Sequence, residues 1–107
     1  MTDRELLEAA AKAAGFDIDY LAGKAIRRES DGQPVYWNPL ADDGDALRLA
    51  VKLKLNVLAQ YANGGGAGVV TVESHEPFDA KQQLTRGDPY AATRRAITRA
   101  AAAMDKG

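Results

Sequence analysis

The chain has 107 residues, of which 46% are hydrophobic and 27% charged, with no cysteine and a formal net charge of -1 at pH 7. We expect one domain over residues 1–107, because this length buries a core large enough to fold without cross-links. The composition excludes disulfides and zinc–thiolate sites, and the weak net charge gives no overall attraction to nucleic acids or anionic membranes. The N-terminus lacks a signal-peptide pattern and no apolar run approaches the roughly 18 residues of a membrane span, so we expect a cytoplasmic protein.

The first element is predicted to be an amphipathic helix that begins at the N-terminus. Thr2 and Glu5 have the spacing of a capping box, and Gly15 is typical of the residue that follows a helix end. Phe16, just beyond that end, is placed to fold back onto the helix. The predicted apolar stripe comprises Leu6, Leu7, Ala10, Ala13 and Ala14.

A hairpin is predicted next. Residues 16–21 alternate apolar and acidic side chains, which fits either a short extended segment or the approach to a loop. Residues 24–29 and 35–37 have the character of two strands joined by a turn over 30–32. Pro34 and Pro39 keep the second strand short, since proline cannot donate to a ladder. We expect Trp37 to anchor the following helix to the sheet.

The central helix has a well-marked start. Asp42 or Asp43 is predicted to cap a helix that begins near Gly44, and Asp45 adds negative charge in the first turn, where the helix dipole favours it. The predicted apolar stripe of this helix comprises Ala46, Leu47, Leu49, Ala50, Val51 and Leu53.

A second hairpin and a third helix complete the predicted order. Residues 56–62 and 68–74 alternate like strands, and the glycine-rich segment 63–67 predicts the turn between them. Residues 75–87 are predicted to be a surface connection with Phe78 and Leu84 as tethers. Asp88 and Pro89 predict the start of a helix that runs to about Met104. Its predicted buried stripe comprises Tyr90, Ala96, Ile97, Ala100, Ala101 and Met104.

This order indicates an α+β fold. We predict three helices packed on an antiparallel sheet of about four strands, in the order α-β-β-α-β-β-α, as a layered sandwich.

One family resemblance accompanies this pattern. The segment WNPLADDGDALRLAVKL, followed by a strand pair and then DPYAATRRAITRAAAAM, resembles the phage ABA sandwich domain, the NinX-like small proteins of phages and prophages. The resemblance extends from residue 16 onward, and the residues that carry it are Trp37, Asn38, Pro39, Asp42, Asp45 and the helix over 91–101. It implies a layered alpha-beta sandwich and a phage or prophage origin. The function of that family is undefined, so the resemblance implies no catalytic residues.

Two acidic segments have a possible chemical role, and each has a simpler explanation. Asp42, Asp43 and Asp45 offer clustered oxygens of the kind that hard cations bind, but their spacing is not that of an EF-hand and helix capping accounts for them. His75 lies between Glu73 and Glu76, but a single histidine without a second histidine or a thiol is thin support for a zinc site. We favour capping for the first and a solvated loop for the second.

Other catalytic and cofactor motifs are missing from the sequence. The glycine run at 64–66 leads into a strand, whereas a phosphate-binding loop leads into a helix through Lys-Ser/Thr, so we favour a hairpin turn. No G-x-S-x-G, Cys–His pair or H-E-x-x-H occurs. We therefore expect a protein that is not an enzyme and uses no cofactor or metal.

The one basic surface is predicted on the last helix, at Arg94, Arg95 and Arg99, with Arg86 nearby. We expect a solvated or internally paired face, and we predict that the aspartates at 42, 43 and 45 pair with these arginines within one chain or across a dimer. Our functional prediction is a phage accessory protein that works through protein contacts, with Trp37, the three aspartates and the three arginines as interaction candidates. Nucleic-acid binding through the arginines is the alternative, and a metal-dependent enzyme at the aspartates is a weaker one.

Overall fold

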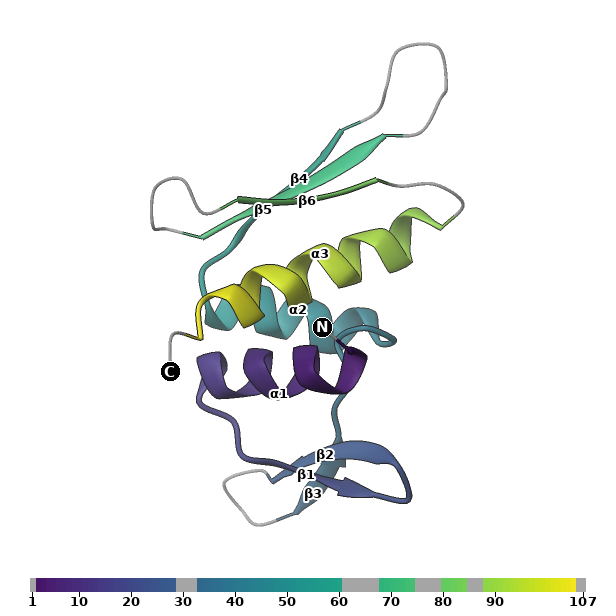
Figure 1. The fold of residues 1–107 in the computed structure, drawn as a ribbon, viewed down its shortest axis with the longest axis vertical. Helices are drawn as coiled ribbons and strands as arrows, with labels where there is room; N and C mark the ends of the chain where they lie inside the picture. The colour runs from purple at the N-terminus through teal and green to yellow at the C-terminus, as the bar shows by residue number, and fades with distance from the viewer. Residues whose placement is uncertain (1, 29–32, 61–67, 75–79, 85–87, 106–107) are drawn as a thin grey trace.

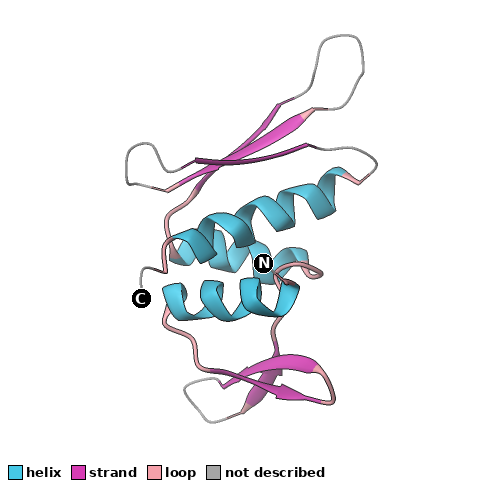
Figure 2. Cartoon of the chain, viewed as in Figure 1, coloured by secondary structure: helices cyan, strands magenta, loops and turns pink. Residues whose placement is uncertain are grey.

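The helices lie in the middle of the molecule, and a small antiparallel sheet lies at each end. The computed structural model describes residues 2–28, 33–60, 68–74, 80–84 and 88–105. It measures 49 × 30 × 24 Å, and Figures 1 and 2 show the layers in the order sheet, helices, sheet. The described residues contain no helix that is both long and apolar enough to cross a membrane.

The N-terminal half contains the first helix and the first sheet, here called the N-terminal sheet. Helix α1 spans Asp3–Ala14, and the sheet has the order β1 (Ile18–Leu21), β2 (Lys24–Arg28), β3 (Pro34–Tyr36). The capping box is present, and accepting hydrogen bonds from Thr2 lowers the pKa of Glu5. Of the two alternatives predicted for residues 16–21, the structure has the extended segment, as strand β1. A two-residue turn at Ala22 and Gly23 joins this strand to β2. The pairing of β2 with β3 confirms the predicted hairpin, although its turn lies outside the described residues.

The C-terminal half adds two helices and the second sheet, here called the C-terminal sheet. Helix α2 spans Asp43–Lys52, strands β4 (Asn56–Gln60), β5 (Val69–Glu73) and β6 (Ala80–Leu84) pair antiparallel in that order, and α3 spans Pro89–Ala103. The pairing of β4 with β5 confirms the second hairpin, and Asp88 caps α3 as predicted.

The α+β class and the three helices are confirmed, whereas the single sheet of about four strands is wrong. Among the described residues, six strands form two separate sheets, and the segment predicted as a surface connection contains β6. The predicted tether Leu84 lies in β6, and Phe78 lies outside the described residues. Strand β6 has the sequence AKQQL, which carries little apolar alternation, so its pairing with β5 defines it better than its own pattern does.

Helix α3 lies in the helical layer between the two sheets, and neighbouring elements cover it on several sides. It contacts α1, α2, β5 and β6, and Figure 1 shows it running between the C-terminal sheet and α1. Small residues permit this close approach, since protein interiors are packed as densely as organic crystals and leave little empty space between elements. Most of the buried residues of α1 and α3 are alanines, at positions Ala10, Ala11, Ala14, Ala92, Ala96, Ala100, Ala101 and Ala102.

Two predicted stripes were too wide. Leu47 and Val51 are 63% and 69% exposed, because they lie on the side of α2 opposite the fully buried Leu49. Tyr90 is 70% exposed although it shares a face with the buried Ile97. Figure 1 shows the first turns of α3 extending beyond the end of α1, in agreement with this exposure.

The first two helices end with the same hydrogen-bond pattern but with different residues. Phe16 N donates to Ala11 O at the end of α1, and Leu55 N donates to Ala50 O at the end of α2. This Schellman pattern requires a left-handed residue just after the helix. That residue is Gly15 (φ 78°) after α1 but Lys54 (φ 57°) after α2. The second helix end therefore carries backbone strain that the first avoids.

We expect Lys54→Gly to stabilise the protein by up to about 1 kcal/mol, because glycine removes the left-handed strain. Gly15→Ala should lower stability by about 1 kcal/mol for the opposite reason, since an added Cβ meets nothing within 4 Å and only the backbone conformation is penalised. Urea unfolding followed by circular dichroism measures both. Equal effects of the same sign would contradict this account.

Candidate functional site

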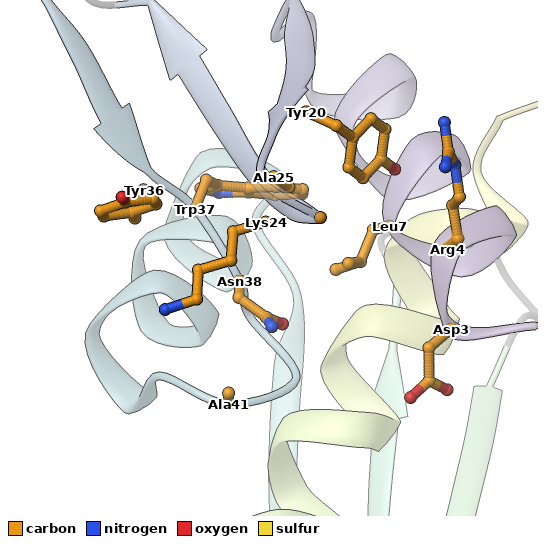
Figure 3. A pocket seen from close by; sticks show the side chains of 11 residues that line it. Asp3, Arg4, Leu7, Tyr20, Lys24, Ala25, Tyr36, Trp37, Asn38 and Ala41 are labelled. Carbon is orange, nitrogen blue, oxygen red and sulfur yellow. The ribbon is translucent and has the colours of Figure 1, made fainter.

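A hollow lies between the N-terminal sheet and the start of α1. It has a volume of about 540 Å³, and its walls come from α1, β1, β2 and the turn between them, β3 and the segment before α2. Figure 3 shows its main side chains. The lining residues used below are Asp3, Arg4, Leu7, Tyr20, Lys24, Ala25, Tyr36, Trp37, Asn38 and Ala41.

The floor of the pocket is apolar and belongs to the core. Leu7, Ala25 and Trp37 are all less than 9% exposed, and Trp37 stacks edge-on against Phe16 at 5.9 Å between ring centroids. Arg27 in turn lies over Phe16, with its guanidinium carbon 4.5 Å from the ring centroid. The prediction that Trp37 anchors the central helix is consistent with its place in the same core cluster as Leu49 and Ala50 of α2.

Two cation–aromatic pairs flank this floor. The guanidinium of Arg4 lies 4.0 Å from the ring centroid of Tyr20, and the ammonium of Lys24 lies 5.6 Å from that of Tyr36. Figure 3 shows the first pair on one side of the pocket and the second on the other. Tyr36 is 64% exposed, so the pocket is bordered by a large aromatic surface that solvent reaches.

A carboxylate holds the Arg4 side of the pocket in place. Glu8 Oε1 accepts hydrogen bonds from Arg4 Nε at 3.2 Å and from the Tyr20 hydroxyl at 3.3 Å. Burial raises the pKa of Tyr20, and the nearby charge of Glu8 raises that pKa further. Tyr20 therefore stays protonated and keeps donating to Glu8 at neutral pH.

The segment between β3 and α2 is held by its own polar side chains. Asn38 Oδ1 accepts from Leu40 N at 3.0 Å, and Asn38 N donates to Asp45 Oδ2 at 2.9 Å. Asp42 caps α2 by accepting from Asp45 N at 2.8 Å. Trp37, Asn38, Asp42 and Asp45, on which the family resemblance rests, thus connect β3 to α2.

The three aspartates divide between two arginines. Asp45 and Asp42 lie 2.8 and 3.8 Å from Arg48, whereas Asp43 pairs with Arg94 at 2.7 Å. Among the residues that the structure describes, no group of three or more His, Cys, Asp or Glu side chains is arranged to hold a metal ion. The other candidates, His75 and Glu76, lie outside those residues, as does the glycine run at 64–66.

The predicted pairing of aspartates with arginines is confirmed for one pair, Asp43 with Arg94. Arg94 is the enclosed member of this pair, with its side chain 17% exposed, and its Nε also donates to Leu40 O at 3.0 Å. Arg95 pairs instead with Asp3 of α1 at 2.9 Å. Arg99 also has a partner, and Arg86 lies outside the described residues. The basic surface is thus largely engaged within the chain.

The structure brings together residues that our sequence interpretation did not connect. Of the interaction candidates, Trp37 alone lines the pocket, while the aspartates and arginines lie along α2 and α3. Arg4, Lys24 and Tyr36 were not predicted as site residues. One indication was available, because Tyr36 precedes the buried Trp37 in an extended segment and neighbouring strand residues face opposite sides.

The fold and the pocket define an α+β protein with a preformed, partly apolar cavity next to one of its sheets. Comparison of the sequence with models of known protein families and with curated proteins gives no match.

We expect Asp42→Ala to lower stability by about 1 kcal/mol and Asp42→Asn to have little effect, because asparagine caps a helix about as well as aspartate does. Thermal unfolding with and without magnesium or calcium measures this. Stabilisation of the wild type by either cation, lost in Asp42→Asn, would instead favour a metal site.

We expect Arg94→Ala to cost about 1–3 kcal/mol, since it removes an enclosed charge-assisted pair and leaves Leu40 O without its donor. Arg95→Ala is the matched control and should cost less than about 1 kcal/mol, because its pair with Asp3 is solvent-exposed. Urea unfolding at low and high salt compares them. Similar losses in both variants would show that the enclosure of Arg94 contributes nothing.

Proposed function

We propose that the chain is a small phage or prophage accessory protein that acts in the bacterial cytoplasm, without catalysis, by binding another protein. We further propose that the pocket beside the N-terminal sheet is the contact surface. The proposed phage or prophage origin rests on the family resemblance, which includes the Trp37–Asp45 segment. The binding role rests on the pocket itself.

The observation that carries the binding role is the composition and accessibility of the pocket. Tryptophan, tyrosine and arginine are the residues most enriched at the energetic centres of protein interfaces, and all three line it. The exposed ring of Tyr36 adjoins a floor that is already buried and ordered. A preformed site of this kind loses little conformational entropy when a partner binds.

Nucleic-acid binding through α3 has less support. Arg94 and Arg95 are both engaged in ion pairs within the chain, and Arg94 is mostly enclosed. A phosphate would have to compete with those carboxylates. The alternative therefore remains a prediction that the following experiment also addresses.

Site-specific photo-crosslinking in bacterial cells tests the proposal. The crosslinking residue p-benzoylphenylalanine replaces Tyr36 or, as the matched control, Leu47, which is 63% exposed on α2. We expect protein adducts of defined mass from position 36 and none from position 47. Those adducts should disappear in the Ala41→Phe variant, because the added ring fills the pocket.

Three results would contradict the proposal. Adducts that form equally at both positions would indicate random collision. Adducts at position 36 that persist after Ala41→Phe would place the contact outside the pocket. Adducts that contain nucleic acid in place of protein would support the alternative function.

A further inference from the structure

The pocket also carries information about the chemistry of its ligand, and this inference rests on the proposed function. Its floor of Leu7, Ala25 and Trp37 offers no charged group, so it suits an apolar side chain. A volume of about 540 Å³ lies within the range of small-ligand sites and admits an aromatic or branched side chain.

The charged side chains around the floor differ in whether an oppositely charged side chain pairs with them. Asp3 pairs with Arg95 at 2.9 Å, and Arg4 pairs with Glu8 at 3.2 Å. Lys24 differs, because within the described part of the chain its ammonium has no carboxylate partner and lies only near the ring of Tyr36. One positive charge at the pocket is therefore available to a ligand.

A second donor lies on the same side. The Oδ1 atom of Asn38 accepts the hydrogen bond from Leu40 N, which leaves the Nδ2 group of Asn38 as a donor. In Figure 3, the side chains of Lys24 and Asn38 lie on the same side of the pocket as Tyr36, opposite Arg4. An ammonium and an amide N–H₂ together suit a carboxylate, which only accepts hydrogen bonds.

We infer that the pocket binds a partner polypeptide through a large apolar side chain, which enters the floor, and a neighbouring carboxylate, which Lys24 and Asn38 receive. The charge balance of the pocket argues against a polyanion. The carboxylates of Asp3 and Glu8 are matched by Arg95 and Arg4, which leaves Lys24 as the positive charge that a ligand can use. One positive charge suits a single carboxylate better than a run of phosphates.

Selection from a library of short random peptides displayed on messenger RNA, with the full chain as bait, tests this inference. We expect enriched peptides to share a large apolar residue close to Asp or Glu, and to shift backbone amide resonances of the pocket residues in the labelled protein. Lys24→Gln should weaken their binding about fivefold, the size of one favourable surface charge pair. Replacing the peptide carboxylate with an amide should weaken wild-type binding similarly and should weaken Lys24→Gln by a smaller factor, since only the Asn38 donor is left to receive the carboxylate.

Control variants separate this inference from the proposed function. Lys12→Gln removes an exposed lysine that does not line the pocket and should leave affinity unchanged, while Ala41→Phe should abolish binding. Thermal unfolding confirms that each variant is folded, and Tyr36→Thr replaces Ala41→Phe if that variant is not.

Peptides that occupy the pocket but show no preference for a carboxylate would overturn the ligand class and leave the proposed function intact. If no peptide binds, or if bound peptides shift only residues elsewhere, both fail. Salt-dependent binding of short DNA or RNA that Lys24→Gln abolishes would overturn the inference in favour of a nucleic acid.

Discussion

The packing of α3 between α1, α2 and the C-terminal sheet is the constraint on which the rest of the structure depends. A helix that is covered on several sides must present small residues to its neighbours, and the alanines of α1 and α3 meet this need. Its polar side chains must also find partners inside the molecule. Thr98, fully buried, donates to Arg94 O at 2.8 Å, and Arg94 reaches both Leu40 O and Asp43. The same helix thus holds the core together and fixes the segment that leads into α2.

The elements of this fold were largely predictable because their ends are written in local sequence. Capping residues at Thr2, at Asp42 or Asp43 and at Asp88 marked the three helix starts, and the turn residues at 30–32 and 63–67 marked the two predicted hairpins. Long-range arrangement was not predictable in the same way. Strand β6 is defined by its pairing with β5 and not by its own sequence pattern. The division into two sheets depends on contacts among the helices, which the sequence pattern does not specify.

The site was less predictable than the fold, for a related reason. The acidic and basic clusters stood out in the sequence, yet most of their charges have structural partners, such as Asp45 with Asn38 N and Arg94 with Asp43. The pocket combines one to three residues from each of α1, β1, β2, β3 and the segment before α2, which lie far apart along the chain. Only the tertiary fold brings Arg4, Lys24 and Tyr36 to one hollow, so spacing along the chain carries almost no information about it.

The position of the pocket at the margin of the core separates recognition from folding. Its floor residues, Leu7 and Trp37, are needed for packing, but Arg4, Lys24 and Tyr36 are exposed side chains that the core does not use. Substitutions at these outer positions alter the charge and shape presented to a partner at small cost in stability. If the pocket binds as proposed, the same scaffold can therefore accept changes in the charge and shape of this surface at a few exposed sites without rebuilding its core.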